Sequence, residues 1–344
     1  MSAMKLVGAV ATAALLFGLG GGCMDTTQND AKKIANEGTV AFGQHQYDTA
    51  IDRYKKAVEK WPEHHTAWYN LAKSYAAKKD WANAADAMSH AVQIVPDQAM
   101  YNLTYGRMLY EKAVAAARVE QAAKVSAETK PESITPDLSG VNFEKATEHL
   151  QTAVKQNDEL WRAHYYIGRI DRDTGKAKES ADAFTKALTF GPFEVAPWIA
   201  LTELYRSWDY TKQAAAVAEQ GTLVVPEGSE NLSDLYYVLG MAYTDDRMDD
   251  KAITSLSKAL ELSRDNHKAR FQRGQVYYRK GDTANAKVDL EAFGKTSGQS
   301  LDFLKQQANK MLADIATKTA PPPGTTPDPG AKLSPEDLVK KGKG

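Results

Sequence analysis

Small and hydrophobic positions recur along this chain with a period of 34 residues. Successive members of the first column lie 34, 34, 62, 34, 38 and 34 residues apart, so two gaps carry insertions of 28 and 4 residues. Two further columns contain the same insertions, which makes chance spacing in an ordinary helical bundle a poor explanation. Self-similarity at a fixed period predicts a solenoid of stacked units, an architecture that holds other molecules. The columns are Gly38, Ala72, Gly106, Gly168, Thr202, Gly240 and Gly274; Ala50, Ala84, Ala146, Ser180, Ala214, Ala252 and Ala286; and Ala57, Ala91, Ala153, Ala187, Gly221, Ala259 and Phe293.

Each unit is predicted to form two amphipathic helices joined by a short turn. In residues 65–98, the apolar side chains from Trp68 to Tyr75 have helical spacing. A turn is expected at Lys79, and a second helix is expected to end before Pro96, because proline lacks the N–H that continues a helix.

The glycines of the first column lie inside predicted helices, where glycine costs about 1 kcal/mol relative to alanine. We therefore expect two helices of a unit to approach closely at these points. Thr202 and Phe293 are larger than their columns prefer, so the packing of the units around them is harder to predict. Large residues one turn from the alanine column are expected to fill the space between helices: Tyr54, Met88, Leu150, Phe184, Leu256 and Leu290.

The order of aromatic, leucine, small, tyrosine, alanine and proline positions in "AWYNLAKSYAAKKDWANAADAMSHAVQIVP" at 67–96 resembles the tetratricopeptide (TPR) repeat. The resemblance covers roughly 270 of the 344 residues. It implies an all-α fold, a right-handed TPR superhelix (α-solenoid) of about seven helix-turn-helix repeats with a C-terminal capping helix. The expected ranges are 31–64, 65–98, 99–160 with an insertion at 112–138, 161–194, 195–228, 233–266, 267–300, and 300–316 for the capping helix.

The N-terminal 22 residues have the pattern of a secretory signal. Lys5 precedes an apolar run from Leu6 to Leu19, and three glycines lead to Cys23, the single cysteine of the chain. This resembles a bacterial lipoprotein signal (1–22) and implies that Cys23 is lipidated. Gly20 stands where such signals usually have leucine, so ordinary cleavage with an incidental thiol is the alternative.

The resemblance to lipoproteins also implies a location. Met24, not an aspartate, follows the cysteine. This favours a lipid anchor in the outer membrane, facing the periplasm, within the bacterial cell envelope. Residues 23–30 are expected to be the anchor and a short linker, which holds the first repeat close to the bilayer.

Composition and motifs exclude several kinds of function. The chain has 43 basic and 44 acidic residues, so it has no electrostatic footprint for nucleic acid. None of the seven histidines has metal-ligand spacing, and there is no cysteine pair. No segment is left over for a catalytic domain. We therefore expect a non-enzymatic protein with no cofactor, no metal and no small-molecule substrate.

In TPR proteins the first helix of each unit lines a concave groove that takes a peptide, and this implies a set of binding residues here. The arginines among them would suit an acidic partner segment. The alternative is a solvated face on which Glu111, Asp173 and Glu203 balance the charge. The implied groove residues are Tyr69, Lys73, Arg107, Tyr110, Tyr165, Arg169, Arg172, Arg206, Tyr237, Phe271, Tyr278 and Arg279.

Two other segments are candidates for partner binding. Residues 110–128 contain no helix breaker, so the first helix of the third repeat should overrun by several turns into the 112–138 insertion. That insertion is either a docking site or a tolerated loop expansion. The tail, 317–344, joins a Pro-rich spacer to a basic tip at Lys340, and is either a solubilising tail or a tethered motif.

Two functions follow from these resemblances. The first is a membrane-anchored scaffold for a cell-envelope machine, such as type IV pilus and secretin assembly, gliding motility, secretion or outer-membrane biogenesis. The second is an adaptor that regulates peptidoglycan hydrolases or synthases. Both predict protein partners and a lipid bilayer, and they differ in which proteins co-purify.

Overall fold

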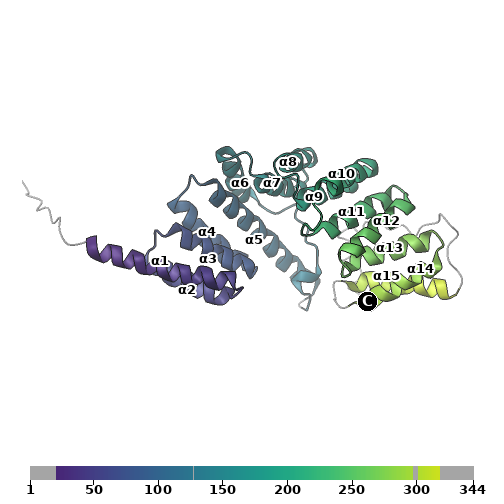
Figure 1. The fold of residues 1–344 in the computed structure, drawn as a ribbon, viewed down its shortest axis with the longest axis horizontal. Coiled ribbons are helices and arrows are strands. Elements are labelled where there is room, and N and C mark those ends of the chain that lie inside the picture. The colour runs from purple at the N-terminus through teal and green to yellow at the C-terminus, as the bar shows by residue number, and fades with distance from the viewer. Residues whose placement is uncertain (1–20, 127, 297–300, 318–344) are drawn as a thin grey trace, which may run out of the picture. The chain divides into compact units, whose positions relative to one another are not determined.

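The computed structural model describes residues 21–126, 128–296 and 301–317, and all regular elements in these ranges are helices (Figure 1). The all-α prediction is therefore confirmed, as is its solenoid form, because consecutive helices pack as antiparallel pairs. The chain divides into two compact units, residues 1–94 and 95–344. The expected signal sequence (1–22) lies almost entirely outside the described residues, and so does the expected tail from 318 onwards.

The first unit contains two helix pairs. Its helices are α1 (Gly21–Gly43), α2 (Tyr47–Lys60), α3 (His65–Ala77) and α4 (Trp81–Ile94). Residues 23–30, expected to be the anchor and a short linker, lie within α1, which begins at Gly21. Cys23 therefore lies within a helix, although its side chain is outside the described part. None of the described helices is long and apolar enough to cross a membrane.

The second unit continues the pairs and adds a last single helix. The first of these helices, α5, has 27 residues and confirms the predicted overrun. The last, α15, matches the expected capping helix closely. The elements are α5 (Ala99–Val125), η1 (Pro131–Ser133), α6 (Glu144–Gln156), α7 (Trp161–Asp173), α8 (Ala177–Phe190), α9 (Val195–Ser207), α10 (Thr211–Val224), α11 (Leu232–Asp245), α12 (Asp249–Leu262), α13 (His267–Arg279), α14 (Thr283–Gly294) and α15 (Asp302–Ala316).

The glycine column marks the points where paired helices touch. A Cβ on Gly168 would lie 2.7 Å from the Phe184 ring, and one on Gly240 would lie 2.6 Å from Leu256 Cγ. Both large side chains are fully buried. The predicted close approach is therefore present, and the tight packing it allows offsets the helix-propensity cost of glycine.

In the fifth repeat, the glycine column holds a larger residue and the column of large residues holds a smaller one. Thr202 is fully buried, and its hydroxyl donates to the Trp198 carbonyl at 2.8 Å. Ala218 stands 34 residues after Phe184, at the position that is large in the other repeats, and it is also fully buried. A larger residue in one column therefore accompanies a smaller one in the other, which conserves volume.

The turn between the helices of a pair has a left-handed residue at a fixed position. Asp209 and Arg247 have φ of 59° and 60°, where an L-residue with a Cβ is disfavoured. In this conformation the chain reverses and the last helical carbonyls are bonded; Tyr210 N, for example, donates to Tyr205 O at 3.0 Å. The column is His45, Lys79, Gly175, Asp209, Arg247 and Gly281.

A side-chain hydrogen bond recurs at the junction between repeats. In five repeats the fourth residue donates to the carbonyl six residues before it, which ties the new helix to the turn that precedes it. The donors differ in type, but the spacing follows the repeat. The bonds are Trp68 Nε1 to Pro62 O (2.8 Å), Asn102 Nδ2 to Pro96 O (2.7 Å), His164 Nε2 to Asp158 O (2.8 Å), Trp198 Nε1 to Pro192 O (2.8 Å) and Arg270 Nη2 to Arg264 O (2.8 Å).

The described part of the 112–138 insertion folds back onto the long helix α5. The Gln121 side chain accepts from Asp137 N at 2.8 Å and donates to Asp137 O at 2.6 Å. Leu138 packs against the buried cluster that includes Val114. The insertion is therefore attached by both hydrogen bonds and apolar contacts.

Candidate protein-binding surface

In the first unit, the predicted groove residues Tyr69 and Lys73 lie together on α3. The Lys73 ammonium is 5.5 Å from the Tyr69 ring centroid and 5.3 Å from that of Phe42 on α1. Lys73 is exposed and Tyr69 is half-buried. Cation–π contacts of this kind are weak at exposed sites, so Lys73 keeps its charge available to solvent.

In the second unit, Arg169 of α7 forms the centre of an aromatic and ionic network. Its guanidinium lies 4.5 Å from the Tyr110 ring, 5.2 Å from Tyr166 and 5.8 Å from Tyr165. It also donates to Glu111 at 3.1 Å. Burial alone would lower the pKa of Arg169, but the tyrosines and Glu111 outweigh it and raise that pKa.

Asp173 joins a second arginine to the same network. The Tyr110 hydroxyl donates to Asp173 Oδ2 at 2.6 Å, and Arg172 donates to Asp173 Oδ1 at 2.9 Å. Tyr110 is only 1% exposed, and this burial raises its pKa well above 10. Arg172 is therefore already neutralised by its neighbour in the chain.

Arg206 of α9 is paired with the next repeat. Its Nε lies 2.7 Å from Asp245 Oδ2 of α11. Tyr237 on α11 is half-buried, and burial raises its pKa. Of the predicted groove arginines, Arg169, Arg172 and Arg206 are therefore ion-paired within the protein, whereas Arg107 is exposed with no ion pair among the described residues.

The acidic-partner prediction is weakened by these pairs, which agree with its alternative. Glu111 and Asp173 do balance the charge, as that alternative held, whereas Glu203 forms no ion pair with a described residue. The third partner is Asp245, which was not among the expected balancing acids. The repeat spacing could have indicated Asp245 as an ion-pair partner, because Asp173 and Asp245 occupy the same position of their repeats.

Four predicted groove residues are corrected, because the structure buries them. Tyr110 stacks on Phe143, the residue before α6, with ring centroids 5.2 Å apart. Arg279 is paired with Asp249 of α12. Phe271 and Tyr278 belong to the cluster that α15 covers. None of the four can contact a partner in this conformation: Tyr110, Phe271, Tyr278 and Arg279 are 1%, 4%, 3% and 5% exposed.

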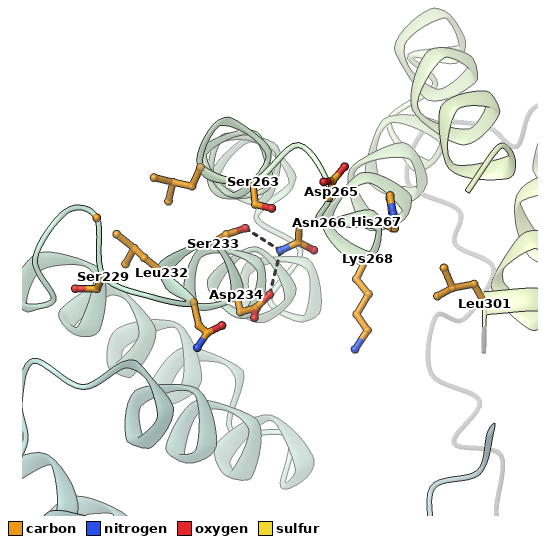
Figure 2. Close-up of a pocket in the computed structure, with 13 residues that line it drawn as sticks. Ser229, Leu232, Ser233, Asp234, Ser263, Asp265, Asn266, His267, Lys268 and Leu301 are labelled. Atoms are coloured by element: carbon orange, nitrogen blue, oxygen red, sulfur yellow. Dashed lines mark hydrogen bonds between the residues drawn. The ribbon is translucent and has the colours of Figure 1, made fainter. Parts of the chain in front are cut away.

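Figure 2 shows a pocket of about 560 Å³ at the beginning of α11 and α13. Its polar groups are largely used within the protein. Asn266 Oδ1 caps α13 by accepting from Ala269 N, and Asn266 Nδ2 donates to Ser233 at 2.9 Å and to Asp234 at 3.2 Å. Across the described ranges, no group of three or more His, Cys, Asp or Glu residues could hold a metal ion.

Comparison with protein families agrees with the packing of the helix pairs. The family model described as tetratricopeptide repeat matches residues 36–99 and 141–195. The model described as TPR repeat matches residues 249–281. The chain contains tetratricopeptide (TPR) repeats. A curated relative, TPR repeat-containing protein MJ1428 of Methanocaldococcus jannaschii, is 24% identical over 152 residues. That match spans 42% of this chain and only 27% of the relative's length.

Solved TPR structures share the fold at low sequence identity. A TPR protein from Parabacteroides merdae superposes with a TM-score of 0.55 at 13% identity, covering 84% of this chain and 99% of that one. PilF of Pseudomonas aeruginosa gives 0.50 at 14%, covering 72% and 97%. PilW, described as a widely conserved type IV pilus biogenesis factor, gives 0.53 at 14%, covering 70% and 96%. These likenesses concern the fold alone.

Proposed function

We propose that this TPR protein is a lipid-anchored scaffold that binds other envelope proteins and supports assembly of a cell-envelope machine. The observation that carries the proposal is the array of helix pairs itself, which accounts for nearly all described residues and leaves broad helix faces for binding. TPR arrays are typically protein-interaction scaffolds, so we propose no enzymatic activity. The likeness to PilW makes a pilus-related machine the first to test.

The proposed anchor is an acyl group on Cys23, in the outer membrane and facing the periplasm. The basic start, the apolar run and the small residues before Cys23 support it. Metabolic labelling with a fatty-acid analogue tests it. Labelling of the parent chain and none of a Cys23→Ser variant is expected, and equal labelling of both would overturn the anchor.

The scaffold itself is tested by crosslinking the anchored protein and identifying its partners by mass spectrometry. Arg169 and Arg172 are poor choices for mutation, because they belong to an internal network. Arg107→Glu changes an exposed charge on the first helix of its repeat, and Lys178→Glu on α8 is a matched control on a second helix. We expect an envelope partner whose recovery falls several-fold in Arg107→Glu and is unchanged in Lys178→Glu.

The identity of the crosslinked proteins decides between machines. Pore, pilus or motility proteins would support the proposal. Peptidoglycan hydrolases or synthases would replace it with the adaptor function. The absence of any specific partner would overturn both.

The insertion is proposed as a second contact region, because its helix projects beyond the repeat and exposes Val119 and Val125, at 56% and 55%. Deleting 112–138 would remove Val114 and Leu138 from a core cluster, so substitution is the cleaner test. Val119→Glu should keep the fold and reduce partner recovery. Unchanged recovery would assign the insertion a structural role only.

A further inference from the structure

A cavity of about 430 Å³ lies between α8 and α10, and none of the described residues that line it is charged. Leu188 of α8 and Val217 of α10 contribute apolar side chains to this α8–α10 groove, and Trp198 of α9 lies in the lining between them. Thr185 of α8 and Ala216 of α10 also line it. An apolar side chain can therefore enter the groove without meeting a charge.

The outer face of α10 beside the groove lacks the charges that other repeats carry there. Ala216, Gln220 and Leu223 have the i, i+4, i+7 spacing of one helix stripe, and all three are exposed, Leu223 by 86%. Loss of charge together with an exposed leucine is typical of a surface that another apolar segment covers. The position of Ala216 holds Asp52, Asp86, Glu148 and Asp182 in the four preceding repeats, and that of Leu223 holds Glu59, Gln93, Lys155, Thr189, Glu261 and Lys295 in the others.

Residues 333–342 of the same chain lie outside the described residues, and their sequence predicts a short helix. Ser334 directly before Pro335 is a helix-start signature, and two acidic residues follow in the first turn. Leu333 and Leu338 have the spacing of a hydrophobic staple, in which the residue before the cap packs against the fourth helical residue.

The two faces of this predicted helix differ in chemistry. Pro335, Leu338 and Val339 have the i, i+3, i+4 spacing of one apolar stripe. On the opposite face, Glu336 and Asp337 each stand four residues before a lysine, which is the favourable order for ion pairs on a helix. A helix this short is marginal in water, so it needs a surface that buries its apolar stripe.

We propose that residues 333–342 dock as a helix in the α8–α10 groove of the same molecule. Leu338 and Val339 enter the uncharged groove, Leu223 extends the apolar contact, and the acids and lysines stay in solvent. The larger pocket at the beginning of α11 and α13 suits this segment less, because most of its lining is polar and part of it is charged. The contact does not depend on the scaffold function.

The segment can reach the groove. Leu333 follows Ala316, where α15 ends, by 17 residues. The helices α15, α13, α11 and α9 pack successively, and three steps of 8–10 Å give roughly 24–30 Å. The length of α15 adds an offset of at most about 22 Å along the helices, so the separation is roughly 35 Å. A Pro-rich spacer of this length reaches about 53 Å as polyproline II, which is enough.

Two spin labels measure the contact in the full chain. One replaces Lys186, which follows the groove residue Thr185 on α8, and the other replaces Lys343. Both are introduced as cysteines in a Cys23→Ser background, because Cys23 is the only native cysteine. Double electron–electron resonance then separates a narrow population of label distances, from docked molecules, from a broad one. We expect about half of the molecules in the narrow population, given a dissociation constant near a local concentration on the order of 1 mM.

Two substitutions should empty the narrow population, and a matched third should not. Leu338→Asp lies outside the helix pairs, so it leaves their packing intact, and it should reduce the narrow population about tenfold. Ala216→Asp restores the acid of the four preceding repeats and should have a similar effect, because it places a charge in the groove. The control is Val288→Asp, which introduces the same acid at the same repeat position on α14, where Val288 is 65% exposed. Circular dichroism checks that each variant keeps its helices.

The proposal is overturned if the parent shows only the broad population, or if either Leu338→Asp or Ala216→Asp leaves the narrow one unchanged. Loss of the narrow population on mixing with excess unlabelled protein would also overturn it, because the docked segment would then come from a second copy. If the narrow population is absent while envelope partners still crosslink, only this inference fails and the scaffold proposal stands.

Discussion

The first unit, α1–α4, and the second unit, α5–α15, share one repeat but neutralise their charges differently. In the first unit the ion pairs lie at the surface and mostly use lysine; the Lys56–Asp52 pair, for example, is 51% and 54% exposed. The second unit also has lysine pairs at its surface, but it adds arginine pairs whose carboxylates are partly or fully buried, as in Arg273–Asp289, where Asp289 is 2% exposed. Only the buried pairs are coupled to packing.

The comparison teaches that helix packing and charge arrangement are separate properties of the repeat. Surface pairs contribute little and weaken in salt, whereas a buried pair is costly to break because it leaves a charge without a partner. The second unit should therefore be sensitive to charge substitutions that the first unit tolerates.

The largest expected difference comes from removing one carboxylate in each unit. Asp289→Ala strips two bonds from the Arg273 guanidinium, at 2.7 and 2.9 Å, and should destabilise the second unit by about 3 kcal/mol. Asp52→Ala on α2 should have no measurable effect. Hydrogen exchange followed by mass spectrometry reports α13–α14 and α1–α2 separately. Equal effects would contradict the contrast.

A smaller difference is expected from the cations that contact aromatic rings. Arg169→Ala removes the Glu111 bond and the tyrosine contacts together, and should cost about 2 kcal/mol. Lys73→Ala in the first unit loses only exposed contacts and should change stability little. Urea unfolding monitored by exchange in α7 and α3 measures both. If Arg169→Ala leaves stability unchanged, the network does not contribute to the stability of the second unit.

Alkaline pH should destabilise the second unit before the first, without any mutation. Burial raises the pKa of Tyr110, Tyr165, Tyr166 and Tyr237 in the second unit, and of Tyr54 in the first. A raised folded-state pKa leaves stability intact below pH 10, the ordinary tyrosine value. Above it the unfolded state loses protons more readily, so stability falls. Exchange should therefore accelerate in α5–α11 before α1–α4, and the reverse order would contradict this.

The smallest effect concerns the turn, where the two units should behave alike. Lys79→Gly in the first unit and Arg247→Gly in the second replace residues with φ of 60°. Glycine tolerates this conformation, so each change should stabilise by about 0.5 kcal/mol after the entropy cost in the unfolded chain. Thermal unfolding measures the gain, and a loss in either would show that the side chain contributes more than the strain costs.

The sequence was sufficient for the helix pairs, because their packing depends on residue size at fixed spacing. Gly168 opposite Phe184 is such a case. The long α5 was also predictable, since residues 110–125 contain no breaker. The left-handed turn residue could not be predicted from the sequence. Glycine, which favours a positive φ, stands at this position only as Gly175 and Gly281, whereas the other members of the column are His, Lys, Asp and Arg.

The candidate site was less predictable from the sequence. The position of a residue in the repeat fixes the helix face on which it lies, but it does not show which other segment packs over that face. Phe271 and Tyr278 have groove positions, yet the capping helix α15 lies over them, and Tyr278 donates to Asp314 at 3.3 Å. Tyr110 is covered by Phe143, the residue before α6. The ion pairs of Arg169 and Arg206 depend on distances between repeats that no single repeat contains.

The junction hydrogen bond has a consequence for how such a chain can diverge. Tryptophan, asparagine, histidine and arginine all supply the same bond from the same position, since each carries an N–H that reaches a carbonyl six residues earlier. Selection on this position acts on a donor and its reach, and not on a residue type. The residue type at this position can therefore change freely over evolutionary time while the hydrogen bond at the junction between repeats is kept.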